Sequence, residues 1–580
     1  MPPANEPSRS GSRDIRGLQL HSPRISLALA LGCIALVFAV YSRSLNFQFV
    51  LDDHRFTADP RIQESGHVWD YFANYVWAQF PGGPPSFYRP VFALWMRISF
   101  LLSALSPWGW HLLSILKHVA VAALLGTLTL RLLRDSTAAL LAAALFALHP
   151  AQTESVSWVT VPDPLMSAGV LAALLCYLRY LEGDVRSGEQ TSRRKSRKTH
   201  ERKTHERKTP RPSIAWLAAS VAAYFAALLA KETAIIFPAV IVGLDLCLKP
   251  TLDSPKARGR SAIASTSVSG AFRHVVPFLC VTLLYLAMRF SALGSTLGAA
   301  TQHLSWRTVM LSWPATLWFY VKVLFWPVRS YSFADPTLIE AFSLRAVALP
   351  LLGLVSVATI LAGALLWAWR KARRELGDEE MLGVRIAFVA GTLLMVLPLL
   401  LTLNLNALNP GDFLHGRYTY LPLAGLMLLL ATLFHTAGKT KPLLLCAGGA
   451  LAIAFSALTF AQEKQWKDDA TIFTVAHELA PHNGPVARNL ADTHVQAALK
   501  LDQEGRCSEA VPVFQKVTQD YPQDWYAWAG LGDCYVQLND LMKAEESLHR
   551  AADISRDSRV IEQWQGLRAH MGLPSSVPAN

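Results

Sequence analysis

The amino-acid sequence predicts an all-α, polytopic membrane protein that ends in a helical-repeat domain. Hydrophobic residues make up 52% of the 580 residues and charged residues only 17%, whereas soluble chains carry about 25% charged residues. Apolar runs long enough to cross a bilayer recur between residues 25 and 460. After residue 466, polar residues return with a helical period. The composition therefore excludes a soluble enzyme, a disordered chain and a disulfide scaffold.

About eleven segments are predicted to span the membrane, within a transmembrane domain over residues 25–461. They are 25–42, 111–131, 136–149, 164–181, 213–230, 233–248, 274–292, 346–369, 385–403, 419–436 and 442–460. Two further apolar segments carry interruptions: 91–105 contains Arg97, and 305–327 contains Pro314 and Lys322. If either spanned the membrane, basic loops would face outward, so we predict that both lie in the interface or re-enter it.

Basic residues orient these spans. Residues 191–212 carry ten lysines and arginines against two glutamates. Cytoplasmic loops are enriched in Lys and Arg, so we predict a cytoplasmic tail over 1–24 and a basic cytoplasmic loop over 182–212. Nucleic-acid binding is the less favoured interpretation of this run. The loop 43–110 and the C-terminal domain then lie outside the cytoplasm, in a multi-pass protein of the inner or plasma membrane.

Residues 462–580 are predicted to form an extracytoplasmic domain of tetratricopeptide repeats. The residues that fit the repeat pattern are Trp528, Leu531, Gly532, Tyr535, Ala544 and Leu548, preceded by Ala510, Phe514 and Pro522. We expect two repeats and a degenerate one at 466–482. Such an array could bind a protein acceptor in a groove, or it could serve as a stabilising cap.

Two cysteines of this domain, Cys507 and Cys534, fall on neighbouring repeat helices that pack antiparallel. Their Cα atoms could then approach to the ~4.4–6.8 Å that a disulfide requires. The alternatives are a bridge and two buried thiols. The sequence contains no CxxC motif and no Cys/His metal spacing.

Chemistry-bearing residues gather on the predicted outer face. Asp52 and Asp53 follow the first span, and such a pair could supply a general base for an acceptor hydroxyl or hold a divalent metal ion; a loop or helix-cap role is the alternative. Four cations could bind an anionic lipid phosphate, or could simply snorkel at the interface. These cations are Arg89, Lys231, Lys322 and Arg417, and the other polar residues near span ends are His149, Glu154, Asp163, Glu232 and Tyr418.

These motifs also occur in a recognisable order. They are FVLDDHRF, YRPV, LFALHPAQTESVSW, LAKETAIIFP, FYVKVLFWP, GRYTYLP and QWKDD, followed by the repeats. Over about residues 45–560 the chain resembles the transmembrane-and-tetratricopeptide-repeat (TMTC-like) O-mannosyltransferases, membrane glycosyltransferases of the GT-C class. The resemblance implies a GT-C-like bundle, a lipid-phosphate-linked sugar donor, an inverting transfer, a Ser/Thr hydroxyl acceptor and extracytoplasmic repeats. The short repeat array resembles that of a bacterial member using a polyprenyl-phosphate sugar.

The resemblance also implies roles for individual residues. Asp52 and Asp53 match the family's acidic pair, one of which would be the catalytic base. Arg417 matches the Arg-Tyr motif and would bind the donor phosphate, while His149 and Glu154 would shape the site. The family often has Arg-Ala-Asp after the tryptophan of the His-Pro motif, but residues 159–163 here contain no arginine. The sugar, or one phosphate contact, can therefore differ.

Two other functions compete with a glycosyltransferase. A non-catalytic envelope scaffold would need neither the acidic pair nor Arg417. A flippase or lipid transporter would place polar residues at mid-membrane in broken helices, often in inverted repeats. The candidate polar residues here lie near one face, and the spans show no internal duplication. The sequence leaves open the sugar, the acceptor, any metal requirement and the oligomeric state.

The predicted topology can be tested with reporter fusions. A reporter placed after Ser187 should report a cytoplasmic location, and one placed after Asn580 an extracytoplasmic location, because the positive-inside rule orients the spans. A cytoplasmic reading after Asn580 would mean that one of the segments 91–105 and 305–327 crosses the membrane.

Overall fold

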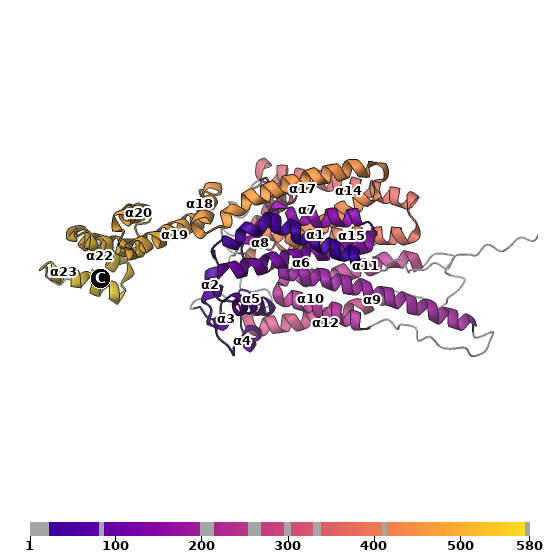
Figure 1. Ribbon diagram of the computed structural model, residues 1–580, viewed down its shortest axis with the longest axis horizontal. Coiled ribbons are helices and arrows are strands. Elements are labelled where there is room, and N and C mark those ends of the chain that lie inside the picture. The colour runs from indigo at the N-terminus through magenta and orange to yellow at the C-terminus, as the bar shows by residue number, and fades with distance from the viewer. Residues whose placement is uncertain are drawn as a thin grey trace, which may run out of the picture. The chain divides into compact units, whose positions relative to one another are not determined.

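The computed structural model describes residues 23–80, 86–197, 214–252, 268–294, 303–328, 338–408 and 414–574. These residues form helices and connecting segments without strands, which confirms the all-α prediction for this part of the chain. The chain divides into a membrane unit that ends at Trp466 and a repeat unit that begins at Lys467 (Figure 1). The N-terminal tail up to residue 22 and residues 198–213 of the basic loop lie outside the described residues.

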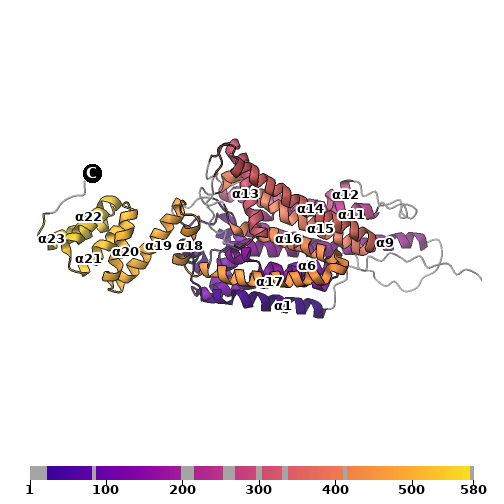
Figure 2. The same ribbon diagram turned by 90° about the horizontal axis from the view of Figure 1, so that it is seen from above.

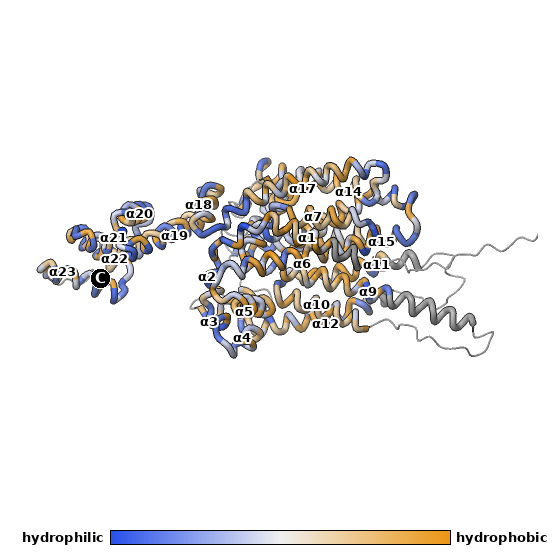
Figure 3. Tube along the Cα trace, viewed as in Figure 1, coloured by the Kyte–Doolittle hydropathy of each residue, from blue (hydrophilic) through white to orange (hydrophobic). Residues whose placement is uncertain are grey.

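The long helices of the membrane unit lie side by side in one bundle (Figure 2). They are α1 (Pro23–Tyr41), α6 (Pro107–Leu133), α7 (Ser136–Leu148), α9 (Asp163–Arg197), α10 (Ile214–Ala230), α11 (Phe237–Leu252), α12 (Val268–Leu293), α14 (Leu349–Glu375), α15 (Asp378–Leu401), α16 (Tyr420–Thr436) and α17 (Lys441–Glu463). Hydrophobic residues follow the lengths of these helices, and hydrophilic residues gather at the two ends of the bundle (Figure 3). We call the end that carries residues 42–106 the first-loop end.

Eight helices among the described residues have the length and apolar composition of a membrane span, and four further apolar helices are shorter. A helix needs about 20 apolar residues to cross the hydrocarbon core. The chain is therefore an integral, multi-pass membrane protein, whereas the number of eleven spans stays a prediction.

Two helices lie along the first-loop end instead of running between the two ends. α5 (Pro90–Ser103) precedes α6 by three residues, and the Trp110 indole N–H at the start of α6 donates to the Ala104 carbonyl at 2.9 Å. α13 (Trp306–Phe325) has the length of a span. However, the Leu304 N–H before it donates to Asn406 Oδ1 at 2.8 Å, and its Leu324 carbonyl accepts from His149 at 3.2 Å. Both partners lie at the first-loop end, the geometry expected of interfacial segments.

The first loop folds into a small subdomain on α5. Its helices are α2 (Asp53–Ala58), α3 (Pro60–Gln63) and α4 (Val68–Ala73). They contribute Phe56, Ile62 and Tyr71 to a core that also contains Trp77 and Phe92. Before α2 the chain turns at Leu51, whose φ of 53° is in the left-handed region. A non-glycine residue in this region is uncommon and marks a position where the surrounding structure imposes the backbone.

Close helix contact fixes the start of α16, which follows the Arg417 segment. A Cβ added to Gly425 of α16 would lie 2.5 Å from the carbonyl oxygen of Gly391 in α15. The two backbones therefore touch, and only glycine permits this approach. The crossing holds the first turn of α16 against the centre of the bundle.

The repeat unit consists of antiparallel helices, as predicted. They are α18 (Asp469–Leu479), α19 (Gly484–Gln503), α20 (Cys507–Asp520), α21 (Trp525–Gln537), α22 (Leu541–Ser555) and α23 (Ser558–His570). The pairs α19/α20 and α21/α22 coincide with the two predicted repeats, and α18 lies where a degenerate one was expected. A Cβ on Gly532 would lie 2.6 Å from Leu548 Cγ, so this glycine does allow the close packing that the repeat pattern requires.

Candidate functional site

The candidate site is built around the segment that joins α7 to α9. This connection contains the short turn η3 (Pro150–Gln152) and the helix α8 (Thr153–Ser157), and it lies at the first-loop end. Its polar side chains are buried, among them Glu154, Thr160 and Asp163. Buried polar and charged groups are costly unless they are paired, and each of these three has a partner from another part of the chain.

Asp53 is anchored to this segment. Its Oδ1 accepts from the Thr160 hydroxyl at 2.7 Å and from the Thr160 N–H at 3.2 Å, and its Oδ2 accepts from the Val50 N–H at 3.0 Å. Burial raises the pKa of Asp53 to about 7, against the opposing effect of these hydrogen bonds. Lys117 of α6 lies next to this contact, because its Nζ donates to the Val159 carbonyl at 3.3 Å.

Asp52 lies differently, although it is the neighbouring residue. The turn at Leu51 leaves Asp52 half-buried, while Asp53 is fully enclosed. The structure therefore separates the two carboxylates into a half-buried one, which solvent can reach, and an enclosed one. A divalent metal ion held by both would have to share Asp53 oxygens that already accept three hydrogen bonds, so the donor set fits a resident metal poorly.

Two predicted cations form tight ion pairs where α10 ends and η4 (Glu232–Ile236) begins. Lys231 Nζ lies 2.7 Å from both carboxylate oxygens of Asp163, and both side chains are about 5% exposed or less. Arg89 contacts Glu232 in bidentate fashion at 3.0 and 2.6 Å. Burial alone would raise the pKa of Glu232, but the Arg89 guanidinium outweighs it and lowers that pKa to about 2.

Arg417 is oriented by Glu154 and by two aromatic rings. Glu154 accepts from the Arg417 backbone N–H at 3.1 Å and from its guanidinium at 3.4 Å, and it also contacts His415 at 3.2 Å. The guanidinium stacks 4.5 Å over the ring of Trp158, which itself stacks on Trp466. The Arg417 side chain is 17% exposed. It is therefore oriented by the protein and still accessible.

Tyr418 connects these pairs. Its ring lies 4.9 Å from Lys231 Nζ and 5.6 Å from the Arg417 guanidinium carbon. One cluster of buried and half-buried side chains thus contains seven of the predicted residues: Arg89, Lys231, Glu232, Asp163, Glu154, Arg417 and Tyr418. Residues 158–163 join this cluster to Asp53.

Two predicted site residues lie outside the cluster. His149 accepts from the Ala151 N–H at its Nδ1, so its Nε2 carries the proton and donates to the Leu324 carbonyl. These two contacts make His149 a structural link between α7 and α13. Lys322 is exposed on α13, two residues from Tyr320, which faces Tyr418. A two-residue step turns a helical side chain to the other face, so the structure does not bring Lys322 to the other cations.

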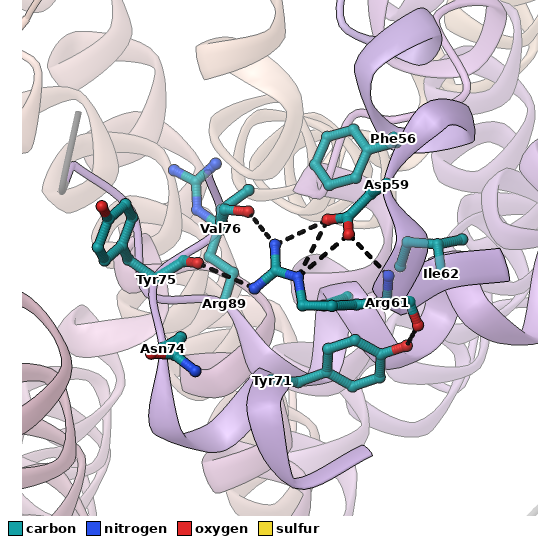
Figure 4. Close-up of a pocket in the computed structure, with 10 residues that line it drawn as sticks. Phe56, Asp59, Arg61, Ile62, Tyr71, Asn74, Tyr75, Val76 and Arg89 are labelled. Atoms are coloured by element: carbon teal, nitrogen blue, oxygen red, sulfur yellow. Dashed lines mark hydrogen bonds and ion pairs between the residues drawn. The ribbon is translucent and has the colours of Figure 1, made fainter. Parts of the chain in front are cut away.

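A small pocket lies between the first-loop subdomain and Arg89 (Figure 4). Asp59 and Arg61 form a buried ion pair at 2.7 Å on its wall, and Arg61 also donates to the carbonyls of Tyr75 and Val76. These contacts hold the chain after α4 against α3. Arg89 lines the same pocket, so the pocket joins the loop to the cluster of ion pairs.

The sequence analysis missed several residues that complete the site: Lys117, Thr160, Trp158, His415 and Trp466. Lys117 is a lysine inside an apolar run, and this was a usable signal. The others are single polar or aromatic residues, whose partners become known only from the fold.

Comparisons with known proteins agree with the motif analysis. Residues 503–571 match the tetratricopeptide repeat family. Over 545 residues the chain is 25% identical to the human protein O-mannosyl-transferase TMTC3, which covers 90% of this chain and 54% of that protein. Drosophila melanogaster Tmtc2, a protein O-mannosyl-transferase, is 34% identical over 168 residues, or 28% of this chain and 18% of that protein. The chain therefore spans about half the length of the human relative.

Among solved structures, the chain is similar in fold to ArnT from Cupriavidus metallidurans, which was crystallised bound to undecaprenyl phosphate. The identity is 14% and the TM-score 0.36, over 92% of this chain and 79% of that chain.

The Lys231–Asp163 pair predicts a large effect on stability. Asp163→Asn should lower the thermal stability of the purified protein in detergent, because it leaves a buried ammonium group unpaired at a cost of about 3–5 kcal/mol. Lys322→Ala is the matched control, since Lys322 is exposed, and its melting temperature should equal that of the wild type. Equal melting of Asp163→Asn and the wild type would contradict the pairing.

Proposed function

Since this chain is a homologue of the TMTC-family O-mannosyltransferases, we propose that it is a membrane glycosyltransferase of the GT-C class. It moves a sugar, of mannose type, from a polyprenyl- or dolichyl-phosphate donor to a hydroxyl acceptor, protein Ser or Thr, on the extracytoplasmic face. The observation that carries the proposal is the segment 158–163, which connects an acidic pair to an oriented, accessible arginine.

Arg417 is the residue best placed to receive the donor phosphate. The Arg417 guanidinium contacts Glu154 at 3.4 Å and stacks over the Trp158 ring, and its side chain is 17% exposed. The Lys231 side chain, by comparison, is 5% exposed and lies against Asp163. Guanidinium groups form strong charge-assisted hydrogen bonds with phosphate. In this proposal Lys231 and Arg89 position the surrounding segments, and the Trp158 ring packs against the Arg417 guanidinium.

We assign different roles to the two carboxylates of Asp52 and Asp53. A general base must reach the acceptor hydroxyl, directly or through one water molecule. Asp52 is accessible, so we assign the base to Asp52, which removes the hydroxyl proton as the oxygen attacks the anomeric carbon and the lipid phosphate leaves. Asp53 is enclosed and bonded to Thr160 and Val50, and it holds the loop in position.

The remaining features fit the same function. Within the described residues, eleven helices of the bundle remain once α5 and α13 are set apart, and this number supports eleven spans. The basic loop 182–212 supports a site and a repeat unit outside the cytoplasm. The repeat unit would present the acceptor protein. A non-catalytic scaffold is the alternative. It would use the buried ion pairs for stability, but it would not need an oriented arginine that solvent can reach.

The proposal is tested with purified protein and a panel of polyprenyl-phosphate sugars. Release of polyprenyl phosphate should occur with one sugar of the panel and should increase when a Ser/Thr peptide is added. No release with any donor, in the presence of peptide, would favour the scaffold.

The division of roles predicts different defects for the two carboxylates. Asp52→Asn should lower turnover by about 10²-fold or more and should lower the melting temperature less than Asp53→Asn does, because Asp52 is half-buried and Asp53 is enclosed. Asp53→Asn should lower both turnover and the melting temperature, because it disrupts the anchor to Thr160. Chelation with EDTA should leave turnover unchanged. If Asp52→Asn keeps full turnover, the base has been assigned to the wrong carboxylate.

Arg417 should control binding of the donor. Arg417→Ala should raise the KM for the lipid donor by an amount equivalent to about 1.5–3 kcal/mol, the value of a hydrogen bond to a charged group. Arg417→Lys should recover only part of this loss, because a point charge replaces a bidentate fork. Steady-state kinetics over a range of donor concentrations measures both, and an unchanged KM in Arg417→Ala would remove the residue from the phosphate site.

A further inference from the structure

The repeat unit contains a cluster of metal-ligand side chains that the proposed function does not use. Asp502 lies near the end of α19, Cys507 is the first residue of α20, and Cys534 lies in α21. One ligand atom from each residue lies within 4.8 Å of the other two. The two cysteines are 2% and 0% exposed. Among the described residues of the protein, this is the group of His, Cys, Asp and Glu whose ligand atoms converge in this way.

The fold of the repeats brings these residues together. α19 ends at Gln503, and Gly505, two residues later, has a φ of +73° that lets the chain reverse direction. The reversal places Cys507 against Asp502, and the Cys507 sulfur lies 3.1 Å from Asp502 Oδ1. α21 packs on α20 in the same core, and its Cys534 sulfur lies 3.3 Å from the same oxygen.

Hydrogen bonds converge on one oxygen of the cluster. Both thiols donate toward Asp502 Oδ1, and the Gln537 side-chain amide donates to the same oxygen at 2.7 Å. The Gln537 side chain thereby fixes the orientation of the Asp502 carboxylate. Two soft sulfur atoms and one carboxylate are a ligand set that Zn²⁺ accepts, at about 2.3 Å for sulfur and about 2.0–2.2 Å for oxygen.

We propose that Asp502, Cys507 and Cys534 form a binding site for a thiophilic divalent cation of the Zn²⁺ type. On binding, two metal–sulfur bonds and one metal–oxygen bond form, and the two thiol protons pass to solvent. No oxidant or reductant is needed. Water occupies the fourth position of the tetrahedron. The bound ion joins α19, α20 and α21, and thus links two neighbouring repeats of a short array.

The competing state is the Cys507–Cys534 disulfide that the repeat register also allows. The structure brings the two sulfurs together as free thiols, so the bridge itself stays a prediction. A disulfide has neither a positive charge nor an S–H donor to offer Asp502, and it would leave this carboxylate only its contact with Gln537. A cation would be bound by all three side chains, and the geometry therefore favours a bound metal ion over the disulfide.

The test uses the full-length protein in detergent, freed of metal and kept reduced. Titration with Co²⁺ should give one equivalent bound per chain and a thiolate-to-cobalt charge-transfer band in the near ultraviolet, which Zn²⁺ then abolishes. Cys507→Ser combined with Cys534→Ser should lose the band, and Asp502→Asn should weaken binding about tenfold or more. The matched control combines Cys280→Ser with Cys446→Ser, two exposed cysteines of the membrane unit, and should keep the band.

A second measurement on the wild type keeps the test decisive if a variant does not fold. Zn²⁺ should protect Cys507 and Cys534 from iodoacetamide, as mapped by peptide mass spectrometry. The proposal is overturned if these cysteines alkylate equally with and without Zn²⁺, or if the double variant retains the cobalt band. It is also overturned if freshly isolated protein, analysed without reductant, carries the Cys507–Cys534 bridge. None of these results depends on transferase activity.

Discussion

The candidate site depends on one short segment, from Trp158 to Asp163, that is buried at the end of the bundle. Trp158 supports Arg417, Thr160 binds Asp53, and Asp163 neutralises Lys231. These residues follow one another closely in the chain, so three parts of the protein are held at fixed spacing by a single connection. The cost of leaving a buried charge unpaired enforces each contact.

Pairing also defines the electrostatics of the site. Arg89 pairs with Glu232, Lys231 with Asp163 and Arg417 with Glu154, so these three pairs add no net charge. Recognition of an anionic donor would then rest on oriented N–H donors instead of a strongly positive surface. Such a preorganised arrangement spares the protein from reorganising charges when the substrate arrives.

Much of the architecture could be predicted from the sequence, because apolar run length and basic loops report directly on membrane insertion. The site was only partly predictable. Asp52 and Asp53 are indistinguishable in sequence, and the backbone at Leu51 separates their environments. Lys322 has the right chemistry but the wrong face of α13, and the role of Thr160 depends on a contact with a residue more than a hundred positions away.

The short length of α7 has a consequence for the depth of the candidate site in the bilayer. Its 13 residues rise only about 20 Å, against a hydrocarbon core of about 30 Å. The chain that follows α7 must therefore begin below the level of the lipid headgroups, or the bilayer must become thinner around it. For the donor proposed above, either adjustment would bring the candidate site closer to the depth at which a lipid-borne phosphate resides. Hydrophobic mismatch at one short helix would then shorten the path of a membrane-dissolved donor.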